Sequence, residues 1–301
     1  MLAQTAVKIK AFTPQIRQAL AKPFTATADR FRPQGEEAAS AKAMRAAGEK
    51  ETARFTAWFS RSRREIMRAQ RLRYRVFSEE YGANIKAPFG LDRDRFDKHC
   101  LHLMVRDNHT GELVGYTRIL TQCRLEKTGG FYSAGEFELG MVAQLNGRVA
   151  EIGRTCIHRD YRGGAVITVL WARLAQFMLE ENIQYLIGCA SLALGEGYDV
   201  AGITAQIRDS HFSASHQRVT PKRPAPPLPA AAEGSEERNK RMPPLLKAYL
   251  RMGAEICGEP CWDPEFNCLD FFVLMAVDRL PARYVQHFMQ PRSTPALSQA
   301  V

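Results

Sequence analysis

One stretch, residues 149–171, most constrains how this 301-residue chain can fold. Its first ten residues alternate between apolar and polar side chains, which predicts a strand, and an apolar run at helical spacing follows. Between them lies a polar turn with Gly163 and Gly164, where backbone N–H groups can converge at a helix N-terminus. Because Arg159 and Arg162 add full positive charges, this turn is a candidate receptor for a phosphate or pyrophosphate group. Strand–turn–helix is also an ordinary α/β connection.

Glu151 and Arg154 both belong to the strand of this stretch. They are three residues apart, so on a regular strand their side chains would face opposite sides of the sheet. A β-bulge between them would bring both to one side. Glu151 is then a candidate general base beside the anion-binding turn, with Arg154 as its neighbour. In the alternative interpretation, the two residues form a structural ion pair.

The chain has a net charge of +10 and an isoelectric point near 9.4. A basic surface favours nucleic acid, anionic lipid or an acidic protein as partner. Nucleic acid is the weakest option because the sequence has no zinc-finger, basic-zipper or RNA-recognition signature. Neither a signal peptide nor an apolar run of ~20 residues is evident, so we expect a cytoplasmic protein with reduced thiols. Cysteines 257, 261 and 268 form a cluster without further metal ligands, and we expect no metal site.

The organisation of the chain indicates an appended N-terminus and one domain. Residues 1–50 read as a basic extension that is either partly disordered or, over 1–24, an amphipathic helix on an anionic membrane. Residues 51–290 form the domain, a proline-rich insert occupies about 209–242, and 291–301 is a tail. We expect an α/β domain with a mixed central sheet flanked by helices. The predicted strands are 53–59, 102–106, 113–120, 149–158, 184–192 and 263–277. The predicted helices are 62–81 with a capping box of Ser62 and Glu65, one with an apolar run over 167–178, 197–208, and one that opens at Pro243.

The order of elements and the residues of the central turn resemble the GNAT acyltransferase superfamily. In that superfamily a bulged central strand and the next helix N-terminus hold the phosphopantetheine and pyrophosphate of an acyl carrier. The run 162–165, Arg-Gly-Gly-Ala, departs from the usual glycine-spaced loop. This departure suits a carrier-protein thioester, which has no adenosine diphosphate to bind, better than free coenzyme A.

Two narrower families resemble the chain more closely. The motif set of the acyl-homoserine-lactone synthases is similar to Arg73, Phe77, Asp94, Asp97, Arg118, Glu151 and Arg154. The L-ornithine N-alpha-acyltransferases of ornithine-lipid synthesis are closer, over about residues 53–290. Segments such as QRLRYRVFSEEYGA, EIGRTCIHRDYRGG, PPLLKAYLRMGA and DPEFNCLDFFVLMAVD resemble that family, and the last two have no counterpart in the smaller synthases.

This resemblance implies that a 3-hydroxyacyl group moves from acyl carrier protein to the α-amine of L-ornithine, giving lyso-ornithine lipid. The donor would be the phosphopantetheine thioester of the carrier, with no bound cofactor. Arg159, Arg162, Gly163 and Gly164 would bind the phosphopantetheine. The carrier is acidic, so basic patches would steer its docking. The amphiphilic product suggests peripheral contact with the inner face of the membrane.

Four side chains are candidates for binding the amino acid. Buried arginines need carboxylate partners, and Arg73 and Arg118 lie in otherwise inward-facing patterns. We expect them to hold Asp94 and Asp97, which are three residues apart and could share one face of a helical turn. The two aspartates would receive the cationic groups of ornithine, and the arginines could also bind its carboxylate. A solvated acidic loop is the alternative for the aspartates.

Three other functions stay open at this point. The acceptor could be another amine, such as glycine or lysine, or the acceptor of an autoinducer synthase. The long insert and the final helix–strand pair argue against an autoinducer synthase. A non-catalytic, membrane-associated module would also account for the basic extension and the charge. Replacing Glu151 by glutamine separates the membrane-associated module from the acyltransferases, because membrane binding would survive and acyl transfer would fall.

Overall fold

The computed structural model describes residues 54–80, 82–195, 197–228 and 242–280. The predicted extension 1–50, the tail 291–301 and residues 229–241 of the predicted insert therefore lie outside the described residues. Within the described ranges, no helix is both long and apolar enough to cross a bilayer.

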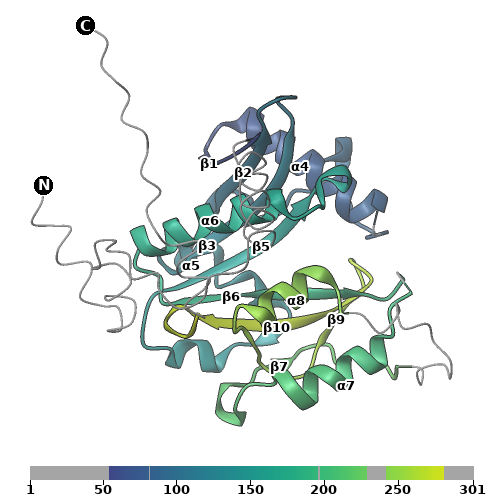
Figure 1. Cartoon of the computed structure of the whole chain (residues 1–301). Coiled ribbons are helices and arrows are strands. Elements are labelled where there is room, and N and C mark those ends of the chain that lie inside the picture. The colour runs from purple at the N-terminus through teal and green to yellow at the C-terminus, as the bar shows by residue number, and fades with distance from the viewer. Residues whose placement is uncertain (1–53, 81, 196, 229–241, 281–301) are drawn as a thin grey trace, which may run out of the picture.

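A mixed sheet of eight strands forms the centre of the molecule (Figure 1), in the order β1-β2-β3-β5-β6-β10-β8 with β9 beside β10. Neighbouring strands are antiparallel except β5 and β6, which are parallel. This is the mixed sheet with flanking helices that the sequence predicts. The strands are β1 Phe55–Ser60, β2 Leu101–Asp107, β3 Leu113–Thr121, β5 Val149–Ile157, β6 Tyr185–Ala193, β8 Glu255–Ile256, β9 Cys261–Asp263 and β10 Cys268–Ala276; β4 Phe137–Glu138 and β7 Thr220–Pro221 pair separately.

Helices cover both faces of the sheet. In Figure 1, α6 (Ala165–Glu180) crosses in front of β2 and β3, and α8 (Pro244–Arg251) crosses in front of β6 and β10. The apolar stripe of α6 packs on the sheet in the largest core cluster, and we call this side the α6 face. Helix α4 (Arg63–Tyr74) packs on the opposite side, the α4 face, against Met104 and Tyr116. The other α-helices in the part of the chain that the structure describes are α5 Leu125–Thr128 and α7 Val200–His211.

Strands β5 and β6 separate in the middle of the sheet. They pair only where Val149–Glu151 face Tyr185–Ile187. At Gly188 the backbones are so close that a Cβ atom would meet the carbonyl oxygen of Ile152 at 2.6 Å, so only glycine fits there. Beside this point is a narrow apolar cavity, lined by Ile152, Leu186, Ile187, Gly188, Cys189, Tyr249, Val273 and Met275.

The first predicted helix begins where the sequence predicts, with Ser62 at the N-cap position, but differs from the structure in its capping contacts and in its second half. The α-helix ends at Tyr74 and the chain continues as a π-helix over Arg75–Glu80. The predicted capping box is wrong, because the side chain of Ser62 makes no capping hydrogen bond. Glu65 instead accepts hydrogen bonds from Ser60 Oγ and from Trp58 Nε1. Side chains at the end of the preceding strand therefore bind the Glu65 carboxylate, which is not free to cap the helix.

The last predicted strand, 263–277, is two strands joined by a tight turn. Asp263 Oδ1 accepts hydrogen bonds from the backbone N–H groups of Glu265 and Phe266 at 2.8 and 3.1 Å. Asn267 then adopts a left-handed conformation with φ of 48°. This is ordinary Asx-turn chemistry. The prediction missed it because apolar residues continue on both sides of the turn.

Candidate active site

A β-bulge at Arg154 forms the centre of the site. Between the positions opposite Arg118 and Tyr116, β5 has one residue more than β3. Arg154 takes up the extra length in a left-handed conformation with φ of 54°. A bulge shifts the alternation of side chains by one. Glu151, three residues before the bulge, and Arg154, within it, consequently both face the α4 side, as the sequence predicts.

Glu151 is buried and held by two backbone donors. Its side chain accepts hydrogen bonds from the N–H groups of Tyr132 and Ser133 at 2.6 and 2.8 Å, and the residue is 3% exposed. Both donors belong to the 3₁₀ turn Tyr132–Gly135. Burial raises the pKa of Glu151, and the hydrogen bonds with Ser133 and Tyr132 only partly oppose this. The carboxylate is therefore fixed in position and more basic than an ordinary glutamate.

Tyr132 lies beside Glu151 and binds Arg154. Its hydroxyl oxygen accepts a hydrogen bond from Arg154 Nη1 at 3.3 Å, and the guanidinium carbon of Arg154 is 5.0 Å from the ring centroid. Glu151 and Arg154 thus have different partners, and no ion pair between them occurs in the structure. The alternative interpretation of these two residues as a structural ion pair is wrong.

Arg73 and Arg118 form the ion pairs with aspartates that the sequence predicts. Arg73 Nη1 and Arg118 Nη1 lie 2.7 and 2.8 Å from the same oxygen, Oδ1 of Asp97. Arg118 Nη1 also lies 2.6 Å from Asp94. Burial alone would raise the pKa of Asp97, but the two arginines outweigh it and lower the pKa to about 2. The loop before β2 is thereby fixed to α4 and β3.

Asp92, which the sequence analysis did not single out, joins Arg154 to the same network. Its Oδ2 lies 2.8 Å from Arg73 Nε and 3.2 Å from Arg154 Nε. Together with the contacts above, three arginines meet three aspartates, and their formal charges cancel. The residue lies in the same LDRDRFD run as the predicted pair, so the run itself was the available signal.

The acceptor capacity of Asp97 is used up within the protein. Its Oδ1 accepts from the two arginines, and its Oδ2 accepts from Gln70 Nε2 at 3.1 Å and from the Asp94 backbone N–H at 3.4 Å. A carboxylate offers about four acceptor positions. Asp94 Oδ1 accepts from Arg118 and from the backbone of Phe96, but its buried Oδ2 has no hydrogen-bond partner among the described residues. The two aspartates orient the arginines, and that they also receive a substrate cation stays a prediction, for which Asp97 has no acceptor position left.

A second set of carboxylates forms no ion pair among the described residues, although the charge of Arg154 is near enough to lower the pKa of two of them slightly. Glu136, Asp263 and Asp270 each place an oxygen within 4.8 Å of the others, and all three residues are buried. Their hydrogen-bond donors are neutral: Cys189 Sγ for Glu136, Ser191 Oγ for Asp270, and backbone N–H groups for Asp263. None of the ion pairs between described residues includes any of the three. This acidic cluster could receive a cation.

Burial raises the pKa of both Glu136 and Asp270, and repulsion from the neighbouring carboxylates adds to the shift. The ionised cluster is therefore unfavourable until a cation arrives. Sequence analysis missed these residues, although Asp270 carried a signal. It lies in the middle of the apolar run CLDFFVLMA, where an acidic residue on a buried strand needs a reason.

The polar residues lie on four neighbouring strands and share the α4 face. Arg118 is on β3, Glu151 and Arg154 are on β5, Cys189 is on β6, and Asp270 is on β10. Apolar residues next to Arg118, Glu151, Cys189 and Asp270 in the chain pack on the α6 face, such as Ile119 and Ile152. A charged row thus crosses the middle of the sheet, with the aspartate–arginine network at one end and the acidic cluster at the other.

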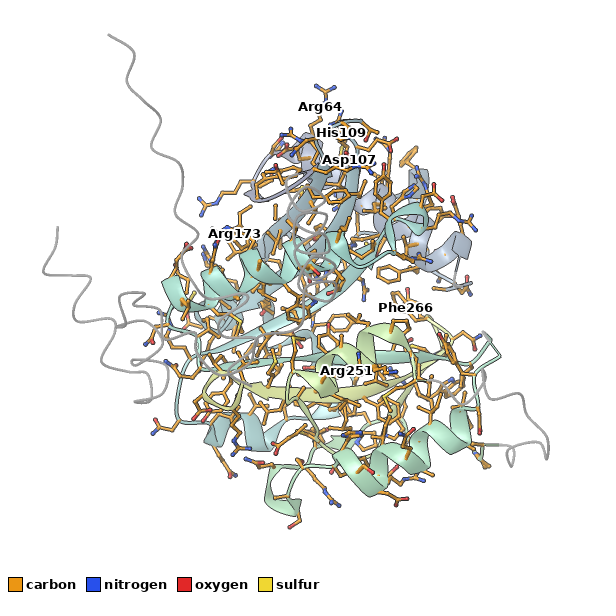
Figure 2. All side chains as sticks on the ribbon, viewed as in Figure 1. Arg64, Asp107, His109, Arg173, Arg251 and Phe266 are labelled. Carbon is orange, nitrogen blue, oxygen red and sulfur yellow. The ribbon has the colours of Figure 1, made fainter. Side chains whose placement is uncertain are left out.

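Phe266 covers part of this row of charged side chains. It belongs to the turn between β9 and β10, and in Figure 2 it lies between the part of the molecule that carries α6 and the part that carries α8. The guanidinium carbon of Arg154 is 4.5 Å from its ring centroid, and Phe77 packs edge-on against it. The misread turn is therefore a wall of the site.

The predicted anion-binding turn lies on the surface at the N-terminus of α6. Gly164 caps the helix with φ of 105°, a conformation that favours glycine, and nothing lies within 4 Å of a Cβ added at Gly163. Arg159 and Arg162 are exposed, and Arg162 Nε donates to the Ile157 carbonyl oxygen at 3.2 Å. The open first turn of a 16-residue helix between two arginines is suited to a phosphate group.

Comparison with known proteins gives the following relatives. The profile of the acetyltransferase (GNAT) domain matches residues 72–172, from α4 into α6. The L-ornithine N(alpha)-acyltransferase of Brucella abortus (strain 2308) is 32% identical over 247 residues, which cover 75% of this chain and 86% of that protein. The enzyme of the same name from Rhodobacter capsulatus is 31% identical over 246 residues, which cover 76% of this chain and 92% of that protein.

Among solved structures, the acyl-homoserine-lactone synthase LasI is 12% identical, with a TM-score of 0.46 and coverage of 78% of this chain and 95% of that one. FeeM, an N-acyl amino acid synthase from uncultured soil microbes, is 14% identical, with a TM-score of 0.45 and coverage of 74% and 91%.

Proposed function

The chain belongs to the L-ornithine N(alpha)-acyltransferase family and is an acyltransferase, and from this premise we propose its reaction in detail. It moves a 3-hydroxyacyl group from the phosphopantetheine thioester of an acyl carrier protein to the α-amine of L-ornithine. The product is lyso-ornithine lipid. One observation carries the proposal: a fixed, basic carboxylate, Glu151, lies on the same sheet face as a buried acidic cluster without a cation.

Glu151 acts as the general base. Both amines of ornithine are protonated near neutral pH, and only a neutral amine attacks a carbonyl carbon. Glu151 removes a proton from the α-ammonium group, directly or through a water molecule. The amine lone pair then forms the C–N bond, the C–S bond breaks, and the thiol leaves with a proton.

The acidic cluster holds the side-chain ammonium group of ornithine. Glu136, Asp263 and Asp270 offer several buried oxygens and no internal cation, and an ammonium group has three donors. Binding the second amine there leaves the α-amine at Glu151. Glycine has no side chain to fill this position, and lysine is one methylene longer. The cluster therefore favours ornithine over the two other amines.

The donor thioester approaches from the α6 face, opposite the face of the sheet that carries Glu151. Its phosphate binds the turn formed by Arg159, Arg162, Gly163 and Gly164. The opening where β5 and β6 separate then leads toward Glu151, and the apolar cavity at Gly188 and Tyr249 lines that opening on the α6 face. Arg73, Arg118 and Arg154, held by their aspartates, provide positive charge for the carboxylate of the amino acid.

An acyl-transfer assay tests the proposal. Purified protein is mixed with 3-hydroxyacyl carrier protein and with ornithine, lysine or glycine, and the products are identified by mass spectrometry. We expect acyl-ornithine, and we expect Glu151→Gln to lower kcat by about 10²- to 10⁴-fold. Equal product from glycine would contradict the role of the cluster, and full activity of the glutamine variant would contradict the role of Glu151.

A divalent cation is the second candidate occupant of the cluster, because three converging carboxylates also suit a metal ion. Elemental analysis of the purified protein, with activity before and after chelation, separates the two occupants. Stoichiometric metal and loss of activity on chelation would assign the cluster to a metal. Full activity of metal-free protein is expected if the cluster binds ornithine.

A further inference from the structure

We propose that an exposed arginine stripe on α4 is the docking surface for the acidic carrier protein. The proposal rests on the proposed function, since it concerns the partner that delivers the thioester. The stripe consists of Arg64, Arg68 and Arg71 on α4 and Arg75 at the start of the π-helix that continues it, all exposed. Their spacing of four, three and four residues places them along one side of the helix.

The stripe is not needed by the fold. Helix α4 packs on the sheet through the other side, where Ala69, Leu72 and Arg73 are buried. No ion pair between described residues includes Arg64, Arg68 or Arg71. Glu65, the acidic residue of the first turn, instead binds Ser60 and Trp58. Concentrated positive charge without internal partners favours an external anionic surface.

The stripe leads to the turn that binds the phosphate of the donor. Arg75, at its C-terminal end, places Nη1 3.2 Å from Nε2 of His158. His158 directly precedes the turn that contains Arg159 and Arg162. The arginines from 64 to 75 span about 16 Å along the helix axis. A carrier bound along this length would have its prosthetic group next to the N-terminus of α6.

An acidic protein fits the stripe better than a membrane does. A helix that lies on a bilayer inserts an apolar side among the lipids. The apolar side of α4 is buried in the protein, and Met67 is the exposed apolar side chain beside the stripe. In Figure 2, Arg64 lies at the upper edge of the molecule, far from Arg251 of α8.

The chain offers a matched control for charge reversal. Arg64 and Arg68 are exposed and four residues apart on α4, and Lys247 and Arg251 are exposed and four residues apart on α8. The test compares Arg64→Glu/Arg68→Glu with Lys247→Glu/Arg251→Glu. Both change the net charge by the same amount. Each variant is assayed with the same acyl group on the carrier protein and on free pantetheine.

We expect Arg64→Glu/Arg68→Glu to lower kcat/KM for the carrier thioester by about tenfold or more at low salt, chiefly through KM. Its activity with the pantetheine thioester should equal that of the wild type, which also shows that the variant is folded. The α8 variant should behave as the wild type with both donors.

Three results would overturn the docking surface. The first is an unchanged kcat/KM with the carrier, and the second is an equal loss in the α8 variant. The third is loss of binding to phosphatidylglycerol vesicles with unchanged use of the carrier, which would assign the stripe to membranes. Wild-type protein that transfers from neither donor would instead contradict the proposed function.

Discussion

At the scale of single residues, the carboxylates of the acidic cluster destabilise the fold when ionised, yet the proposed binding of ornithine needs them ionised. Glu136 and Asp270 are buried with raised pKa values, so each ionised form costs free energy in the folded protein. Evolution tends to keep such groups where a ligand compensates them. The aspartates at the other end of the row show the opposite case, because Arg73 and Arg118 hold the pKa of Asp97 down to about 2.

Replacing Asp270 by asparagine should stabilise the protein without its substrate. The amide keeps the acceptor for Ser191 Oγ and removes a buried charge. We expect the free energy of unfolding at pH 8 to rise by about 1 to 3 kcal/mol, measured by chemical denaturation. The KM for ornithine should rise at the same time. A destabilised variant would show that the carboxylate is compensated within the protein.

The pH dependence of acyl transfer should report Glu151. Its pKa is raised, so the base becomes active only above the range of an ordinary glutamate. We expect log kcat to increase with pH through an apparent pKa above 4.5 and then to level off. The profile is measured with saturating donor and acceptor. In Glu151→Gln the rise of log kcat with pH should disappear. If the rise persists, it belongs to the titration of another group.

Sequence reasoning at this scale finds residues whose type is unusual for their position. Arg73 and Arg118 interrupt inward-facing patterns, and their aspartate partners follow from the cost of a buried charge. Glu136 and Asp263 are missed because each lies next to a turn, where acidic residues are common. Only the folded chain brings them to Asp270, 134 and 7 residues away along the sequence.

At the scale of elements, the separation of β5 from β6 is the feature on which the proposed meeting of donor and acceptor depends. The sequence predicts both strands and the bulge, because these depend on local alternation and on a short spacing. It does not predict where the strands part. That point depends on the contact of Gly188 with Ile152 from a distant segment.

A methyl group at Gly188 should force the strands apart. Its Cβ would lie 2.6 Å from the Ile152 carbonyl oxygen, which is backbone and cannot move aside. We expect Gly188→Ala to destabilise the fold by about 1 to 3 kcal/mol, measured as a shift of the denaturation midpoint. Gly140→Ala is the control, since nothing lies within 4 Å of its added Cβ. Equal stability of both variants would contradict the close approach.

At the scale of the whole molecule, ornithine should stabilise the protein more strongly at high pH. The acidic cluster binds protons more tightly in the folded than in the unfolded state, so the empty protein loses stability as pH rises through the raised pKa values. In the proposed complex, the side-chain ammonium group of ornithine neutralises the cluster in place of those protons. We expect the shift in Tm produced by saturating ornithine to be larger at pH 9 than at pH 6. A shift that does not depend on pH would place the ligand elsewhere.

The overall architecture follows from the sequence to a large extent. The order of strands and helices, the mixed sheet and the anion-binding turn depend on local patterns and on the resemblance of many segments to one family. The order of strands within the sheet and the two-sided site depend on contacts between distant segments, such as β10 with β6. Those contacts also bring Glu136, Asp263 and Asp270 together, which is why the proposed ornithine site differs from the predicted one at Asp94 and Asp97.

The most direct test of the proposed reaction compares ornithine with norvaline, which has the same carbon chain but no side-chain amine. Both are offered to the wild type and to Asp270→Asn with the 3-hydroxyacyl carrier protein, and the acylated nitrogen is located by fragmentation in the mass spectrometer. We predict acylation at the α-nitrogen, a preference of the wild type for ornithine of at least about 10²-fold, and a much smaller preference in the variant. Equal use of norvaline by the wild type, or acylation at the side-chain nitrogen, would contradict the proposed site.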